Sequence, residues 1–579
     1  MSSILSRIQE PADVRALSEA DLAPLCAELR EEIIRVCGKV GGHLGASLGA
    51  VELIVALHRV FKSPVDRIVF DVGHQAYAHK LLTGRLSAID TLRQEGGIAP
   101  FPDPAESRHD AFQTGHACTA VSVALGMLEA KRLRREDGHA VAVIGDGSLT
   151  GGLTFEGLNN AATARAPLVV VLNDNGMSIS VNVGAVSRML RGPEARAFFE
   201  SLGFTYLGPI DGHDLRALID AFREARRARR PIVVHVRTEK GKGFAEAEGD
   251  PHTRGHAMGP YEWRDGKLVR SRGGQQTFSE AFAAALGEAM ARDERVVAVT
   301  PAMLEGSALV GLARHFPERV FDVGIAEQHA VTFSAGLAAQ GMRPVCAIYS
   351  TFLQRAVDQV IHDVCLAKLP VIFAVDRAGL VGADGATHQG AFDVALLRPI
   401  PHLTLAAPVF GEDCGPLLDA ALRTETGAWA IRFPRLTIPR VPPGIQIDPA
   451  PRGARWLRRV ERPIATVITL GTMGLAALEA VEGRDDVAVL DARFVTPLDA
   501  EAIREAARTG AVLTVEEGTT HGGLGSAVLE LLCAERLSPR VRMLGLPDTF
   551  VRHGDARAQR ARLGLDAAGI RAALEQLAS

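Results

Sequence analysis

Residues 140–180 contain two strand-like runs that both end in oxygen-bearing side chains: AVAVIGDGS (140–148) and LVVVLNDNGMSIS (168–180). Apolar, β-branched runs of this length predict buried strands. One polar ending taken alone is typical of a loop or a helix cap. A pair of neighbouring strands that both end in this way could hold a hard cation between them. The glycine-rich turn at 145–147, followed by a helical pattern from about Thr150, also places backbone N–H groups where an anion can bind.

The residue types in the two loops favour Mg²⁺ as the cation. Mg²⁺ takes oxygen ligands in a nearly octahedral arrangement and usually keeps phosphate oxygens in its shell. The side chains of Asp146 and Asn175 and the backbone carbonyl of Met177 are the candidate protein ligands.

Apolar β-branched runs alternate with helical patterns along the whole chain, which predicts α/β domains with mainly parallel sheets flanked by helices. Apolar periodicity lapses at 263–276 and at 435–453, where glycine or proline is concentrated, and both segments are predicted linkers. The predicted domains are therefore 1–272, 273–440 and 455–579.

Charge and composition exclude several classes of protein. The net charge of −4 and pI near 6.5 give no electrostatic reason to expect nucleic acid or a membrane surface as a partner. No apolar run reaches the length of a membrane span, and the first residues lack the apolar core of a signal peptide. Seven scattered cysteines without a CxxC pair favour a reducing compartment. We therefore expect a cytoplasmic protein.

A second informative stretch is FDVGIAEQHAVTFSAGLAAQG (321–341), in which Glu327 stands between a strand-like run and an apolar helical pattern. Alone, Glu327 is best interpreted as a helix-start acid favoured by the helix dipole. Burial would raise its pKa and favour a protonated carboxyl that can donate to a ring nitrogen.

The GDG at 145–147 followed by NDN at 173–175 resembles the diphosphate-binding signature of thiamine-diphosphate enzymes. The resemblance implies that Asp146, Asn175 and Met177 bind the Mg²⁺ that bridges protein and cofactor diphosphate. It also implies that Glu327 protonates the aminopyrimidine of the cofactor.

Longer segments resemble the 1-deoxy-D-xylulose-5-phosphate synthase family: GGHLGASLGAVELIVALHRVF (41–61), DVGHQAYAHKLLTGR (71–85), YSTFLQRAVDQVIHDV (349–364) and DRAGLVGADGATHQGAFD (376–393). The implied fold is a thiamine-diphosphate-binding domain occurring twice, a diphosphate and then a pyrimidine domain, followed by a transketolase C-terminal-like domain. The implied enzyme is a homodimeric transferase with thiamine diphosphate and Mg²⁺ as cofactors. It decarboxylates pyruvate and joins the two-carbon unit to D-glyceraldehyde 3-phosphate, for isoprenoid, thiamine and pyridoxal phosphate synthesis.

The resemblance assigns further roles residue by residue. It implies that four histidines bind substrate and transfer protons: His43, His74, His256 and His388. Histidine suits this task because its neutral and charged forms are both accessible near pH 7. The residues implied to contact the cofactor are His74, Gly115, His116, Ala117, Gly147, Ser148, Asn175, Phe244 and Glu327. Arginine can donate two hydrogen bonds to a phosphate, and the substrate-binding set is Tyr349, Arg355, Arg377, Asp384 and Arg435.

The sequence departs from the family pattern in GHACTA (115–120), at Gly176 and at Leu436. Several tens of residues that family members usually carry are also missing between 183 and 214, around Met189 to Gly203. We expect the fold to be retained, because proteins tolerate changes in loop length. The sequence does not decide how access to the active site is controlled or which acceptor aldehyde is used. Two alternatives therefore stay beside the synthase: a related thiamine carboligase with another acceptor aldehyde, and a catalytically silent paralogue.

Overall fold

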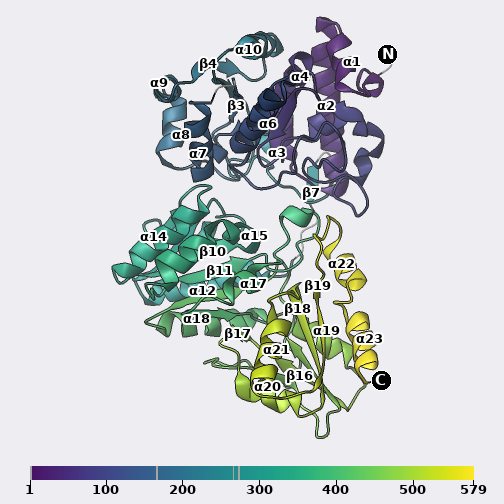
Figure 1. Ribbon diagram of the computed structural model, residues 1–579, viewed down its shortest axis with the longest axis vertical. Coiled ribbons are helices and arrows are strands. Elements are labelled where there is room, and N and C mark those ends of the chain that lie inside the picture. Colours follow the sequence, from purple (N-terminus) through teal and green to yellow (C-terminus); the bar gives the residue numbers. More distant parts are fainter. Residues whose placement is uncertain (1–2, 165–166, 265–266, 271–273, 579) are drawn as a thin grey trace. The chain divides into compact units, whose positions relative to one another are not determined.

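The computed structural model describes residues 3–164, 167–264, 267–270 and 274–578. The chain forms two compact units, one made of residues 1–273 with 324–326 and the other of residues 274–323 with 327–579. Figure 1 shows the helices and strands of both units. In the described part of the chain, no helix is both long and apolar enough to cross a membrane.

The first unit is built on a parallel five-stranded sheet in the order β1-β2-β3-β5-β4. Its strands are β1 (Arg67–Phe70), β2 (Ala140–Gly145), β3 (Val169–Asp174), β4 (Thr205–Asp211) and β5 (Ile232–Arg237). Its helices are α1 (Pro11–Ala16), α2 (Glu19–Val40), α3 (Leu44–Gly49), α4 (Val51–Val60), α5 (Tyr77–Lys80), α6 (Ala120–Arg134), α7 (Gly152–Ala161), α8 (Gly184–Arg191), α9 (Glu194–Leu202), α10 (Leu215–Arg227) and α11 (Ala245–Glu248).

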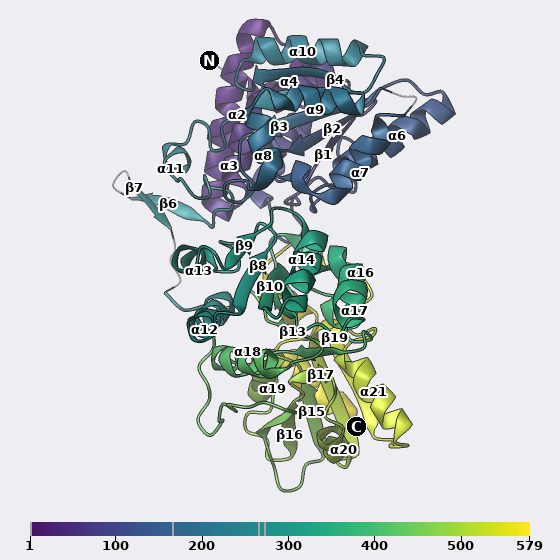
Figure 2. The ribbon, with the colours of Figure 1, turned by 90° about the vertical axis from the view of Figure 1, so that its left-hand side faces the viewer.

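Both faces of this sheet are covered, as the apolar runs predict. Side chains alternate along a strand, so Val141 and Val143 of β2 pack with α4 and α10, whereas Ala142 and Ile144 pack with α6 and α7. Figure 2 shows the strands between these two pairs of helices. The carboxyl ends of β2 and β3 are adjacent, with Gly145 paired to Asn173. This register brings the GDG and NDN loops side by side.

Part of the first predicted linker is structured. Strands β6 (Tyr261–Arg264) and β7 (Lys267–Arg270) pair in antiparallel fashion and overlap the predicted linker 263–276, of which 265–266 and 271–273 lie outside the described residues. The second predicted linker, 435–453, contains no helix or strand in the structure, all of it lying within the described residues. The helix predicted from Thr150 begins at Gly152, after a short 3₁₀ turn over Ser148–Thr150.

The second unit holds two further sheets. The middle sheet, β17-β12-β13-β11-β10-β8-β9, is parallel except for its edge strand β17. Its strands are β8 (Val296–Thr300), β9 (Val320–Asp322), β10 (Arg343–Tyr349), β11 (Ile372–Asp376), β12 (Leu403–Ala406), β13 (Ala428–Arg432) and β17 (Phe494–Thr496). Its helices are α12 (Phe278–Arg292), α13 (Val310–His315), α14 (Glu327–Ala339), α15 (Ser350–Leu353), α16 (Val357–Gln359), α17 (Asp393–Leu397) and α18 (Cys414–Arg423).

The last sheet has the order β14-β16-β15-β18-β19 and is parallel except for β14. Its strands are β14 (Arg455–Arg458), β15 (Ala465–Thr469), β16 (Val487–Asp491), β18 (Ala511–Thr519) and β19 (Arg540–Leu546). Its helices are α19 (Met473–Ala480), α20 (Ala500–Ala507), α21 (Leu524–Ala534), α22 (Ala556–Arg562) and α23 (Ala567–Ala578). One apolar core includes Ile348 of the middle sheet and Ile468 of the last, and β17 adds a strand from the 455–579 region to the middle sheet. The two sheets therefore form one unit.

Candidate active site

The candidate metal ligands of the first unit lie together at the ends of β2 and β3. The backbone N–H of Asn175 donates to a carboxylate oxygen of Asp146 at 3.4 Å, and the side chain of Asn182 donates to the other at 2.6 Å. The amide oxygen of Asn175 accepts from the N–H of Met177 at 3.1 Å. Carboxylate, amide and backbone carbonyl oxygens are thus available within one pair of loops.

The charge state of this edge suits a cation. Asp146 is only 2% exposed, and burial, together with the nearby charge of Asp174, raises its pKa. An ionised carboxylate is costly here unless a positive charge faces it. A bound divalent ion would remove that cost, so the oxygen donors fit Mg²⁺ in both type and charge.

Gly147 is closely packed at the same edge. A Cβ atom at this position would lie 3.0 Å from the Ser178 side chain and 3.3 Å from the amide oxygen of Asn182. The neighbouring Ser148 carbonyl accepts hydrogen bonds from Cys118 and Thr154. The GDG loop therefore contacts both the NDN loop and the segment that carries Gly115, His116 and Ala117.

Three of the predicted histidines form a cluster. The ring centroids of His43, His74 and His256 lie 5.3–6.0 Å apart. Backbone hydrogen bonds between Gly42 and Met258 bring two of the segments together, and the Ser47 hydroxyl donates to the carbonyl of His74 at 3.0 Å. The cluster is thus formed by three separate chain segments.

Burial keeps two of these rings neutral. Burial, followed by nearby positive charge that includes Lys240, lowers the pKa of His74 and of His256 well below the usual value. The Nδ1 atom of each ring is buried and has no hydrogen-bond partner among the described residues. Unsatisfied buried ring nitrogens are rare, so these atoms fit a bound molecule that exchanges hydrogen bonds with them.

The structure adds residues of the first unit that sequence reasoning missed. The Nζ of Lys240 donates to the carbonyls of Ser178 and Ile179 at 2.7 and 3.2 Å. The side chain of Asn182 donates a hydrogen bond to Asp146. The carboxylate of Asp71 accepts the N–H groups of Cys118 and Ala120 at 2.7 and 2.9 Å. Asp71 stands at the start of the segment 71–85, which resembles the family, but the sequence alone predicts no role for it, for Lys240 or for Asn182.

Phe244 is placed differently from the other candidates. Its ring is buried in the apolar core with Met258, and its centroid lies 5.9 Å from that of Tyr261. The structure therefore gives Phe244 a packing role, and a cofactor contact stays a prediction.

Replacing Asp71 with alanine should weaken cofactor binding. The substitution leaves the buried N–H groups of Cys118 and Ala120 without their acceptor, directly after the predicted cofactor segment 115–117, and hydrogen bonds to a charged group are worth about 1.5–3 kcal/mol each. We expect the affinity for thiamine diphosphate with Mg²⁺ to fall about tenfold or more, measured by isothermal titration calorimetry. Unchanged affinity in a folded variant would contradict a role for Asp71 in ordering this loop.

In the second unit, Glu327 is the first residue of α14 and is 4% exposed. Burial raises its pKa, and the charge of Arg355 opposes that shift. The nearest guanidinium nitrogen of Arg355 lies 3.6 Å from a carboxyl oxygen. That oxygen makes no hydrogen bond to any described residue. A buried carboxyl of raised pKa is suited to donating a proton to a ligand nitrogen.

The predicted substrate residues stand at or after the carboxyl ends of three strands of the middle sheet: Tyr349 and Arg355 at β10, Arg377 and Asp384 at β11, and Arg435 at β13. The Arg377 guanidinium lies 4.4 Å from the centre of the Tyr349 ring, a cation–π contact. Tyr349 stacks on Phe352, whose ring meets that of His388 edge to face at 5.6 Å. Arg435, which is 55% exposed, lies 3.9 Å from a carboxylate oxygen of Asp384.

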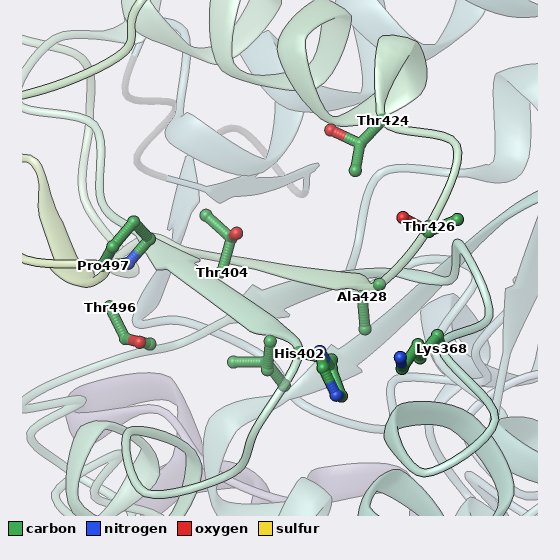
Figure 3. Close-up of a pocket in the computed structure, with 10 residues that line it drawn as sticks. Lys368, His402, Thr404, Thr424, Thr426, Ala428, Thr496 and Pro497 are labelled. Carbon is green, nitrogen blue, oxygen red and sulfur yellow. The ribbon is translucent and has the colours of Figure 1, made fainter.

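A separate pocket of the second unit contains none of the predicted residues. Figure 3 shows its lining at the amino ends of β12 and β13, with Lys368, His402, Thr404, Thr424, Thr426 and Pro497 among the side chains. It lies at the opposite end of these parallel strands from the predicted site.

Comparison with known proteins places these features in a family. The family model described as 1-deoxy-D-xylulose-5-phosphate synthase matches residues 5–197 and 192–238. The models for the pyrimidine-binding and C-terminal domains of transketolase match 274–440 and 454–570. Among solved structures, a transketolase from Leishmania mexicana is similar with 17% identity, a TM-score of 0.47 and 97% of each chain covered.

Two curated relatives cover nearly the whole chain. The 1-deoxy-D-xylulose-5-phosphate synthase of Myxococcus xanthus strain DK1622 is 69% identical over 574 residues, which is 99% of this chain and 98% of the relative. That of Anaeromyxobacter sp. strain Fw109-5 is 51% identical over 629 residues, with 98% and 97% covered. The chain therefore belongs to the 1-deoxy-D-xylulose-5-phosphate synthase family.

Proposed function

We propose that this chain decarboxylates pyruvate and transfers the two-carbon unit to D-glyceraldehyde 3-phosphate, giving 1-deoxy-D-xylulose 5-phosphate and CO₂. The observation that carries this proposal is the 69% identity over 99% of the chain to a curated synthase of that name. The enzyme is a transferase of the transketolase type, and its cofactors are thiamine diphosphate and Mg²⁺. We also propose the domain boundaries 1–272, 273–440 and 455–579.

The metal ligands in this proposal are Asp146, Asn175 and the carbonyl of Met177. Their support is the adjacency of β2 and β3 and the cost of an ionised Asp146 without a cation. His74, Gly115, His116, Ala117, Gly147, Ser148 and Phe244 complete the proposed cofactor-binding set. In that set, Gly147 suits the close approach of two loops, and a Cβ atom there would crowd Ser178 and Asn182.

When bound, thiamine diphosphate supplies a nucleophilic carbon and a ring that accepts the electron pair left by decarboxylation. The role of Glu327 is to hold a proton at its carboxyl and donate it to a nitrogen of the cofactor. Its burial and raised pKa support this role. Arg355, which lies 3.6 Å away, limits how far the pKa rises.

The histidines handle protons at the substrate. His43, His74 and His256 form one cluster, and the low pKa values of His74 and His256 keep these rings neutral at neutral pH, with one ring nitrogen that accepts a hydrogen bond and one that donates. His388 is proposed for the same task from the second unit, with its Nδ1 held at 2.9 Å by the Thr387 hydroxyl.

The arginines of the second unit are proposed to bind the phosphate group of the acceptor aldehyde. Arg355, Arg377 and Arg435 supply planar groups of donors that match phosphate oxygens. Tyr349 orients Arg377 through the cation–π contact, and Asp384 lies beside Arg435. This set would bind a phosphorylated aldehyde in preference to an unphosphorylated one.

Acceptor selectivity tests this assignment. Purified protein with thiamine diphosphate, Mg²⁺ and pyruvate should consume D-glyceraldehyde 3-phosphate at least about a hundredfold more efficiently than D-glyceraldehyde, because the phosphate contacts contribute several kcal/mol. Product formation from each aldehyde, followed by mass spectrometry, gives the ratio of kcat/KM values. Equal efficiencies would contradict the arginine assignment and favour a carboligase with another acceptor.

We propose further that the enzyme works as a homodimer in the cytoplasm. The sequence resemblance supports the homodimer, and the seven cysteines, all free in the structure, support a reducing compartment. Light scattering of the purified protein should give twice the 61.6 kDa mass of the chain.

A further inference from the structure

The loop that carries Asp384 and His388 is closed on itself at a narrow neck. The loop comprises residues 378–392, between β11 and α17. Gly379 and Gly390 exchange backbone hydrogen bonds at 2.8 and 2.7 Å. A loop held at its neck still needs support along its length to present side chains precisely.

Glu517 of β18 provides such support near the start of the loop. Its carboxylate accepts the N–H of Leu380 at 2.9 Å, and both residues are buried. A Cβ atom on Gly379, whose φ is +79°, would lie 2.7 Å from the carboxyl carbon of Glu517. Glycine is therefore needed here both for the backbone conformation and for the close approach of Glu517.

Glu517 is itself fixed by α22. The same carboxylate oxygen accepts from the Nε of Arg560 at 2.9 Å, and the two side chains are 5% and 14% exposed. A buried pair of this kind adds little net stability, yet it restricts where its members can lie. The carboxylate is thus held between the loop and the last domain.

The end of the loop near Gln389 and Ala391 also contacts the C-terminal domain. Gln389 accepts the N–H of Val381 at 2.7 Å and donates to the carbonyl of Val551 at 3.5 Å. The N–H of Thr519 donates to the carbonyl of Ala391 at 2.9 Å. Contacts from β18 and from the segment before α22 therefore hold the loop at several points.

We propose that Glu517, held by Arg560, is a positioning residue for the acceptor substrate. Through it the C-terminal domain holds the 378–392 loop so that Asp384 and His388 face the substrate. This inference rests on the proposed function, because that function makes those two residues part of the substrate site. It gives the last domain a direct part in substrate recognition.

Replacing Glu517 with alanine tests the proposal. The variant should raise the KM for D-glyceraldehyde 3-phosphate about tenfold, because small displacements of positioning groups have effects of this size or more. The affinity for thiamine diphosphate with Mg²⁺ should stay within about twofold, since the loop is not among the proposed cofactor contacts. Glu517→Gln keeps an acceptor for the N–H of Leu380, so its KM should be close to the wild-type value. Arg560→Gln removes the group that holds Glu517 and should also raise the KM, although the substitution is outside the loop.

Glu516 offers a matched control. It is the preceding residue of β18, and its side chain has other partners than Glu517: it accepts the N–H groups of Leu524 and Gly525 at 2.8 and 2.9 Å. Glu516→Gln replaces the carboxyl group at a similarly buried site and should lower the melting temperature without changing the KM. Hydrogen exchange should accelerate over 378–392 in Glu517→Ala and not in Glu516→Gln.

Two results would overturn the inference: an unchanged KM in a folded Glu517→Ala variant, or loop exchange that is the same in both variants. If the wild-type protein makes no 1-deoxy-D-xylulose 5-phosphate, the proposed function fails instead. The exchange measurement does not depend on turnover, so it separates the two failures.

Discussion

Glu327→Ala should lose about a thousandfold in turnover, because a positioned acid–base group contributes about 10²–10⁴. The alanine variant cannot hold the proton that the wild-type carboxyl keeps through its burial and raised pKa. Binding of Mg²⁺ should be unchanged, since the proposed metal ligands lie in the other unit. Steady-state kinetics with saturating cofactors measures the loss, and calorimetry measures retained binding.

The control for this variant is a glutamate that is only a helix-start acid. Glu280 lies in the first turn of α12 and forms a capping box with Thr277. Glu280→Ala should cost about 1 kcal/mol of stability and leave turnover near the wild-type value. If Glu327→Ala behaved in the same way, Glu327 would be a helix-start acid and no more.

Asp146→Ala is expected to weaken cofactor binding about a hundredfold or more. Loss of groups that merely orient metal ligands costs 10–100-fold, and Asp146 is proposed as a ligand itself. Titration of thiamine diphosphate at fixed Mg²⁺ should show the change in affinity, and saturating Mg²⁺ should recover part of the turnover.

Asp66 provides a control on the same sheet. It is a buried aspartate immediately before β1 that accepts hydrogen bonds from His139 at 2.8 and 3.2 Å. It therefore lies near the amino end of a parallel strand, away from the GDG and NDN loops. Asp66→Asn should lower stability and leave cofactor affinity unchanged. Equal affinity losses in both variants would assign the effect of Asp146 to folding.

The parts of the site that the sequence predicted are local in the chain. The run before Asp146 and the run before Asn175 predict two buried strands, and the structure confirms β2 and β3 as neighbours. Glu327 likewise stands at the predicted start of a helix. In each case a few consecutive residues determine both the element and the chemistry at its end.

The missed residues depend on distant partners. Lys240 meets carbonyls some 60 positions away, Asp71 meets N–H groups almost 50 positions away, and Glu517 meets Leu380 across 137 positions. Periodicity and motif spacing carry no information about such pairings. The same is true of β17, whose place in the middle sheet follows only from its pairing with β12.

The shortened segment is a compact helical pair in the structure. The N-terminal family match is in two parts that overlap at 192–197, from the turn after α8 into the first residues of α9. Leu190 and Phe199 are buried, and the Arg196 guanidinium lies 5.0 Å from the Tyr206 ring centre. The Anaeromyxobacter alignment of 629 positions exceeds the 579 residues of this chain by 50, whereas the Myxococcus alignment of 574 does not. The short form is therefore compatible with high similarity to a curated synthase.

Carbon-13 NMR of one reaction mixture tests the central claim most directly. The mixture contains the purified protein, thiamine diphosphate, Mg²⁺, uniformly labelled pyruvate and D-glyceraldehyde 3-phosphate. The account predicts labelled CO₂ together with 1-deoxy-D-xylulose 5-phosphate labelled at C1 and C2. Labelled CO₂ or acetoin without that sugar, or no turnover from a folded and cofactor-loaded protein, would contradict it.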